Sequence, residues 1–199
     1  MTALVHTEQY AMFELSLTGT SEGNPYADVN LEADFIHVSS GRKITVGGFY
    51  RGNGTYAVRF MPTDAGDWSY ITRSNDAELN GVTGRLIADL AGKDNHGRVL
   101  RAADVLKGKA RESYGSELAY RFCYEDGTPY QPYGTTCYAW TNQAPEVQDR
   151  TIETLKTAPF NKIRMCVFPK FYDFNNADPE LFAYEGSMEE GFDHSRFNE

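Results

Sequence analysis

The sequence lacks the cysteine pattern of a disulfide-stabilised protein. Its 199 residues hold only 3 cysteines, Cys123, Cys137 and Cys166. A small secreted framework would need more of them, evenly paired and set in loops, whereas these three fall in segments with the composition of strands. We therefore expect three reduced, buried thiols in a cytosolic protein. A catalytic thiol, which needs a neighbouring histidine and an electropositive setting, stays open as the alternative.

Long apolar runs and clusters of basic residues are also missing. No stretch approaches the roughly 20 apolar residues that cross a bilayer, and residues 1–6 do not begin a signal peptide. The chain carries 28 acidic against 19 basic side chains, a formal net charge of −9, with no Lys/Arg cluster. This balance argues against a nucleic-acid or membrane partner and favours a cytoplasmic protein.

The sequence shows no pattern of metal ligands. Its histidines have neither ligand spacing nor cysteine pairing, and they are His6, His37, His96 and His194. We therefore predict no metal site and no cofactor.

The first hundred residues have the pattern of short strands broken by turns. Apolar and polar residues alternate over 13–18 and 29–35, and turn clusters at 40–41, 51–54 and 64–67 recur about every ten residues. This pattern predicts an immunoglobulin-like antiparallel β-sandwich of seven to nine strands over residues 1–103.

The pattern changes after this predicted sandwich. Residues 104–117 are polar and weakly patterned, as in a linker, and residues 118–199 form the second predicted part. There, 133–140 and 160–170 are predicted as strands buried on both faces, with a helix from Pro145 to about Thr157 between them. A strand, a helix and a strand of these lengths form a βαβ unit with a parallel strand pair.

The end of the chain has a different composition. Residues 171–199 have the composition of a long loop, with a helix start predicted at 192–199. Two parallel strands and one helix leave apolar faces uncovered. We therefore expect this sequence to be the front part of a longer protein.

Several blocks of the sequence resemble a family of enzymes. Residues 23–35, 46–75 and 95–97 resemble the β-sandwich domain found ahead of some bacterial glycoside hydrolase barrels. Residues 126–143 and 160–172 resemble the opening of the barrel that follows. That barrel belongs to the glycosidases related to apiosidases and, more distantly, to the cellulase-like enzymes of glycoside hydrolase clan A.

The resemblance implies a TIM (β/α)8 barrel with its active site at the carboxyl ends of the strands. It also implies hydrolysis of a glycosidic bond by an acid/base carboxylate and a nucleophilic carboxylate. In clan A these follow the fourth and seventh strands. Because this chain supplies only the opening βαβ part, both catalytic carboxylates are expected beyond Glu199.

Arg164 is the candidate that supports the missing nucleophile. It lies in a strand predicted to be buried, where an unpaired guanidinium would be very costly, so it must meet a carboxylate. The motif Phe160-Asn161-x-x-Arg164 resembles the second-strand motif of clan A cellulases, which implies that Arg164 hydrogen-bonds the nucleophilic carboxylate. A structural ion pair at the rim of the barrel stays open as the alternative.

Polar and aromatic residues follow both predicted barrel strands. Flat rings bind the C–H faces of sugars and amides bind hydroxyls, so such a mixture suits a carbohydrate subsite. The predicted substrate-binding residues are Tyr138, Trp140, Asn142, Gln143, Lys170 and Tyr172. Packing of Trp140 under the following helix stays open.

The main functional hypothesis is the N-terminal portion of a glycoside hydrolase that is inactive as a 199-residue fragment. Its partner would be an oligosaccharide or glycoside substrate. Two alternatives are a carbohydrate-binding sandwich and a structural sandwich that forms homo-oligomers through its strand edges. An exposed row of aromatic residues on a sheet face would favour binding.

Overall fold

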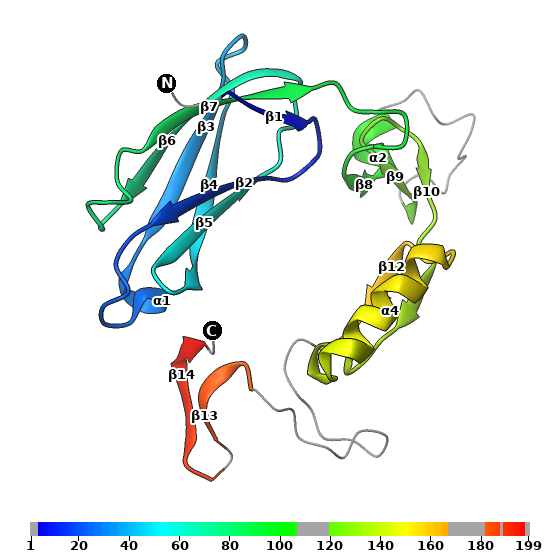
Figure 1. Ribbon diagram of the computed structural model, residues 1–199. Coiled ribbons are helices and arrows are strands. Elements are labelled where there is room, and N and C mark those ends of the chain that lie inside the picture. Colours follow the sequence, from blue (N-terminus) through cyan, green and yellow to red (C-terminus); the bar gives the residue numbers. More distant parts are fainter. Residues whose placement is uncertain (1–3, 107–119, 167–181, 188, 198–199) are drawn as a thin grey trace. The chain divides into compact units, whose positions relative to one another are not determined.

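The computed structural model describes residues 4–106, 120–166, 182–187 and 189–197. The chain divides into two compact units between Tyr130 and Gln131. The described part is mostly β-structure with few helices (Figure 1). The predicted linker at 104–117 lies largely outside the described residues, so the predicted domain limits stay a prediction.

The first unit contains a seven-stranded mixed sheet that nearly closes into a barrel. Its strand order is β1-β7-β6-β3-β4-β5-β2. The strands are β1 (Val5–Glu8), β2 (Phe13–Thr18), β3 (Leu31–His37), β4 (Lys43–Gly52), β5 (Thr55–Phe60), β6 (Gly66–Ser74) and β7 (Thr83–Asp89), and a short helix α1 (Pro25–Asp28) precedes β3. The strands predicted from alternation are confirmed, because local periodicity marks half-buried strands well.

The prediction that the strands are all antiparallel is wrong for one pair, because β1 runs parallel to β7. β1 and β2 lie at opposite ends of the strand order, yet only four residues separate them. The link bonds to the neighbours of both strands. Gln9 N–H donates to Asp89 O at the end of β7 at 2.8 Å, and Tyr10 N–H donates to Pro62 O after β5 at 2.8 Å. A short link between opposite ends forces the sheet to curl back on itself.

Strand β4 changes partners along its length. Residues 43–47 pair with β3, and residues from Gly48 onward pair with β5. A Cβ at Gly48 would lie 2.5 Å from Cδ2 of Leu31 and 3.1 Å from the carbonyl oxygen of Ala57. The missing side chain therefore lets the two halves of the sheet approach at the bend.

Aromatic side chains fill the interior of this sheet. The rings of Phe35 and Phe60 stack with centroids 3.9 Å apart, and Phe60 lies edge-on to Trp68 at 5.0 Å. Trp68 is fully buried, and its Nε1–H donates to the carbonyl oxygen of Asp64 at 2.9 Å. The stacked phenylalanines join β3 to β5, so aromatic packing holds the curled sheet together.

A network of charged groups is centred on Asp34, whose side chain is 9% exposed. Its carboxylate accepts hydrogen bonds from Arg73, from Thr45 Oγ1 at 2.6 Å and from Lys43 Nζ at 3.3 Å. The hydrogen bond from Arg73, followed by those from Thr45 and Lys43, holds the pKa of the Asp34 carboxyl well below its usual range.

We expect Asp34→Asn to lower the free energy of unfolding by about 2 kcal/mol at pH 7, because charge-assisted bonds to a buried carboxylate are lost. A depressed carboxyl pKa contributes stability above the unfolded pKa of about 4, and that contribution is lost as pH falls toward the folded value. The deficit of the variant should therefore shrink between about pH 5 and pH 2. Urea unfolding across this range measures it.

Asp67→Asn is the matched control. Its carboxylate is 45% exposed and lies 3.4 Å from Arg85, and an exposed pair contributes about 0–1 kcal/mol. Equal losses from the two variants, or a deficit for Asp34→Asn that stays constant with pH, would contradict the role given to the network.

A small antiparallel sheet completes the first unit. Its strands are β8 (Val99–Arg101), β9 (Phe122–Tyr124) and β10 (Pro129–Tyr130), and helix α2 (Ala102–Leu106) follows β8. The hairpin predicted around Asp126-Gly127 is confirmed, with Gly127 at φ 90°. Arg98 donates to both oxygens of Glu125 at 2.8 and 2.6 Å, and this fork fixes the start of β8 to the end of β9.

The second unit begins with a parallel strand pair. Its elements are β11 (Gly134–Thr136), the 3-10 helix η2 (Trp140–Asn142), α4 (Pro145–Thr157) and β12 (Lys162–Arg164). The parallel pairing and the limits of the helix are confirmed. The prediction that both strands are buried on both faces is wrong, because each exposes two of its three residues. Among the described residues neither strand has a second neighbour, so two strands and one helix cannot enclose a core.

A hairpin of β13 (Tyr184–Ser187) and β14 (Gly191–Phe197) follows. The helix start predicted at 192–199 is therefore wrong where the structure describes it. The ring of Tyr184 packs against His194 and Phe197, each at 4.9 Å, and these cross-strand contacts favour a hairpin over a helix. None of the described helices is long and apolar enough to span a membrane.

Candidate functional site

Four of the predicted substrate residues, Tyr138, Trp140, Asn142 and Gln143, follow the carboxyl end of β11. The backbone ladder continues past both β11 and β12, with Cys137 N–H donating to Arg164 O at 2.9 Å and Cys166 N–H to Tyr138 O at 2.7 Å. Because parallel strands end at the same edge, this ladder brings Tyr138 beside Arg164. The guanidinium carbon of Arg164 lies 5.9 Å from the centroid of the Tyr138 ring.

Arg164 is exposed, which corrects the prediction that it is buried. Among the described residues no carboxylate lies within ion-pair distance of it, so the predicted carboxylate partner is not found there. The argument from desolvation cost fails because an exposed guanidinium keeps its water. The Arg164 side chain lies at the end of β12, and its support of a nucleophile stays a prediction.

Trp140 is anchored to the helix that follows it. The indole is half-buried, and its Nε1–H donates to the carbonyl oxygen of Gln148 in α4 at 3.1 Å. This bond agrees with the alternative in which Trp140 packs under the helix. The remaining exposed part of the ring is the part that a ligand could contact.

Two residues that the sequence did not identify hold the connecting loop. Gln148 Nε2 donates to Gln143 O at 2.6 Å and to Thr141 O at 3.4 Å. Thr141 Oγ1 donates to Cys166 O at 3.0 Å, which ties the loop to the end of β12. Neither residue has a distinctive sequence signal, because these bonds depend on where the backbone carbonyls lie.

Asn142 has an incomplete set of hydrogen bonds. Its Nδ2 is buried and has no acceptor among the described residues, whereas Gln143 Nε2 donates to Ala139 O at 3.2 Å. A buried donor without an acceptor costs about 1–3 kcal/mol. Lys170 and Tyr172 lie outside the described residues, and their roles stay predictions.

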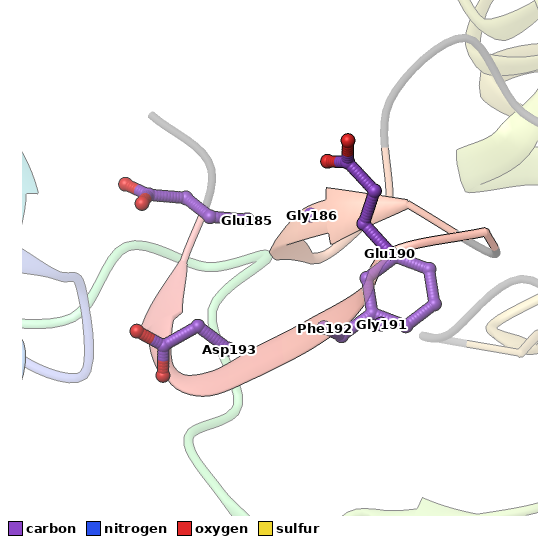
Figure 2. Close-up of a pocket in the computed structure, with 6 residues that line it drawn as sticks. All are labelled: Glu185, Gly186, Glu190, Gly191, Phe192 and Asp193. Carbon is purple, nitrogen blue, oxygen red and sulfur yellow. The ribbon is translucent and has the colours of Figure 1, made fainter.

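The acidic residues near the carboxyl end line a shallow hollow of about 490 Å³ in the β13–β14 hairpin. Its lining residues are Glu185, Gly186, Glu190, Gly191, Phe192 and Asp193. Figure 2 shows the carboxylates of Glu185 and Asp193 on one side of the hairpin, with the Glu190 carboxylate projecting away from both. Asp193 accepts bonds from the backbone N–H and Oγ of Ser195, which lower the pKa of its carboxyl. A general acid needs a raised pKa, so the lowered pKa of the Asp193 carboxyl argues against that role for it.

The remaining candidates for chemistry are metal-binding clusters and the cysteine thiols. No cluster of three or more metal-binding side chains occurs in the part of the chain that the structure describes. The three cysteines are free, but Cys137 and Cys166 are only half-buried, which corrects the expectation of three buried thiols. Burial raises the pKa of the Cys123 thiol. Cys123 therefore stays protonated and unreactive at neutral pH.

Comparison with known proteins finds one family and a similar solved structure. Residues 6–75 match a family described as a domain of unknown function, DUF5060. A crystal structure from Bacteroides vulgatus ATCC 8482, described as a "putative glycoside hydrolase", is 39% identical with a TM-score of 0.79. No curated protein matches the chain.

The match to the solved structure covers 97% of this chain and 36% of that one. The chain therefore spans about a third of the length of that protein. Over this length it shares the fold of a glycoside hydrolase-like protein, which agrees with the resemblance seen in the sequence.

Proposed function

We propose that this chain forms the N-terminal portion of a glycoside hydrolase of the apiosidase-related group. In this proposal the seven-stranded sheet is an immunoglobulin-like support domain, and β11, α4 and β12 open a (β/α)8 barrel. The two catalytic carboxylates come from later strands of the barrel. The substrate is an oligosaccharide or glycoside, bound at the carboxyl ends of the strands.

The observation that carries this proposal is the position of Tyr138 beside Arg164 at the carboxyl end of a parallel strand pair. In open and closed α/β sheets ligands bind at this end of the strands. The identity of 39% to a protein described as a "putative glycoside hydrolase" supports the choice of reaction.

In the proposed mechanism each residue of the site has a separate role in binding the sugar or positioning the nucleophile. The ring of Tyr138 binds the C–H face of a sugar, and the amides of Asn142 and Gln143 bind its hydroxyls. Lys170 and Tyr172 extend the same subsite. The planar fork of Arg164 binds the nucleophilic carboxylate, fixes its orientation and lowers its pKa, so that it stays ionised for attack on the anomeric carbon.

The alternative functions have less support. Phe49, 39% exposed, is the one strongly exposed aromatic side chain among residues 4–90. The seven-stranded sheet therefore has no exposed row of aromatic residues in its described part. Such a row would have favoured a carbohydrate-binding sandwich over a support domain.

The test is Tyr138→Ala in a protein that carries the complete barrel. We expect KM for an aryl glycoside or oligosaccharide substrate to rise about tenfold, because one ring contact is lost, with little change in kcat. Tyr133→Ala is the matched control, since Tyr133 is 59% exposed and precedes β11 at its amino end. Unchanged KM for Tyr138→Ala, or equal effects of both variants, would contradict the proposed subsite.

A further inference from the structure

The small sheet of the first unit has two unlike faces. Its register pairs Val99 with Tyr124, Arg101 with Phe122, and Phe122 with Tyr130. Paired residues of an antiparallel sheet share a face, so these five side chains form one surface, which we call the aromatic face. The opposite face is formed by Leu100, Cys123 and Pro129, and Cys123 is fully buried.

The aromatic face is partly open to solvent, with Tyr124 and Tyr130 half-buried and their rings held by neighbouring rings. Phe122 is 46% and Val99 41% exposed. The rings of Tyr124 and Tyr130 meet edge-to-face with centroids 5.3 Å apart, and His96 lies 5.4 Å from Tyr124. Exposed aromatic groups held in a fixed geometry bind flat ligands with little loss of side-chain freedom.

The charges beside this face favour a neutral ligand. Arg101 donates to both oxygens of Asp104 at 2.8 and 3.0 Å, and His96 Nδ1 lies 2.8 Å from Asp126 Oδ2. The Arg101 guanidinium is thus matched by a carboxylate of the same unit, and the His96 ring is held by another carboxylate. The face therefore offers no surplus of positive charge to a polyanion, and the whole chain carries a formal net charge of −9.

We propose that the aromatic face binds a neutral polysaccharide chain. Sugar rings would lay their C–H faces on Phe122 and Tyr124, while Asp126 and Arg101 at the edges bind hydroxyl groups. The choice of carbohydrate rests on the proposed function. Binding at this face requires neither the barrel nor hydrolysis, because residues of the first unit alone form it.

The test is native electrophoresis of the 199-residue chain in gels that contain hydroxyethylcellulose, arabinoxylan, galactomannan or, as an anionic comparator, polygalacturonate. We expect at least one neutral polymer to retard the chain. Phe122→Leu and Tyr124→Leu keep apolar bulk but remove the ring, and each should weaken binding about tenfold. Phe49→Leu, which alters an exposed aromatic residue of the other sheet, should leave binding unchanged.

Several outcomes would overturn the assignment. No retardation by any neutral polymer, or retardation by polygalacturonate alone, would each do so. Binding by the Phe122 and Tyr124 variants as strong as that of the unchanged chain would do so too. A dimer seen by light scattering that dissociates in Phe122→Leu would assign the face to a second copy instead. Binding lost in Tyr138→Ala but kept in the Phe122 and Tyr124 variants would support the proposed barrel subsite while excluding this one.

Discussion

Arg164→Lys in a protein that carries the complete barrel is expected to lower kcat about a hundredfold, with KM changed much less. Lysine keeps the positive charge but loses the planar fork that aligns a carboxylate through two parallel hydrogen bonds. In the proposal Arg164 is a positioning residue that acts through the nucleophile and does not touch the sugar. The loss should therefore appear in turnover rather than in substrate binding.

Steady-state kinetics with an aryl glycoside would measure this split. Arg150→Lys is the matched control, because it makes the same substitution at an exposed position of α4. The pH profile adds a second readout, since loss of the guanidinium should raise the apparent pKa of the nucleophile on the acidic limb. Near-normal kcat with an unshifted profile would return Arg164 to a structural role.

The fragment itself provides a simpler comparison. The 199-residue chain should hydrolyse no glycoside, because both catalytic carboxylates are placed outside it in the proposal. Hydrolysis by the fragment would mean that a catalytic pair lies within these residues.

The predictions that succeeded depend on local sequence. The helix Pro145–Thr157 is set by a proline at its first turn and by the spacing of Val147, Ile152 and Leu155. The strands of the large sheet follow from alternation and from the turn at residues 51–54, where Gly52, Asn53 and Gly54 all have positive φ. Each of these signals is contained within about a dozen residues.

The features that were missed depend on distant contacts. The parallel pairing of β1 with β7 joins Val5 to Leu86, and nothing near either residue indicates it. The β13–β14 hairpin was missed because its many acidic residues give the segment the composition of a loop. The contacts of Tyr184 with His194 and Phe197 that favour the hairpin form only in the folded chain. Alternation predicts that a segment is a strand but does not identify its partner.

The candidate site shows the same division. Tyr138 was selected by its position after a predicted strand and Arg164 by the motif around it, and the parallel ladder explains why they meet. The bonds from Gln148 and Thr141 to backbone carbonyls require the folded loop, so sequence could not reveal them. Exposure of Arg164 was also missed, because the apolar run around it is typical of a strand that is covered in a larger sheet.

Phe35→Ala is expected to lower the free energy of unfolding of the first unit by about 4 kcal/mol. Phe35 is fully buried, stacks on Phe60 at 3.9 Å and lies 5.6 Å from Tyr70. Its removal leaves a cavity between β3 and β5 that the curled sheet cannot close without breaking its own ladder. The loss is a large share of the total stability of about 5–15 kcal/mol typical of a domain.

Urea unfolding in a Trp140→Phe background measures this change for the first unit alone. The chain has 2 tryptophans, so Trp68, which is fully buried beside Phe60, becomes the sole indole reporter. The midpoint should fall while the slope stays unchanged. Phe49→Ala is the control, because Phe49 is 39% exposed and its loss should cost less than about 1 kcal/mol. A similar small loss for Phe35→Ala would mean that the stacked phenylalanines do not hold the curled sheet together.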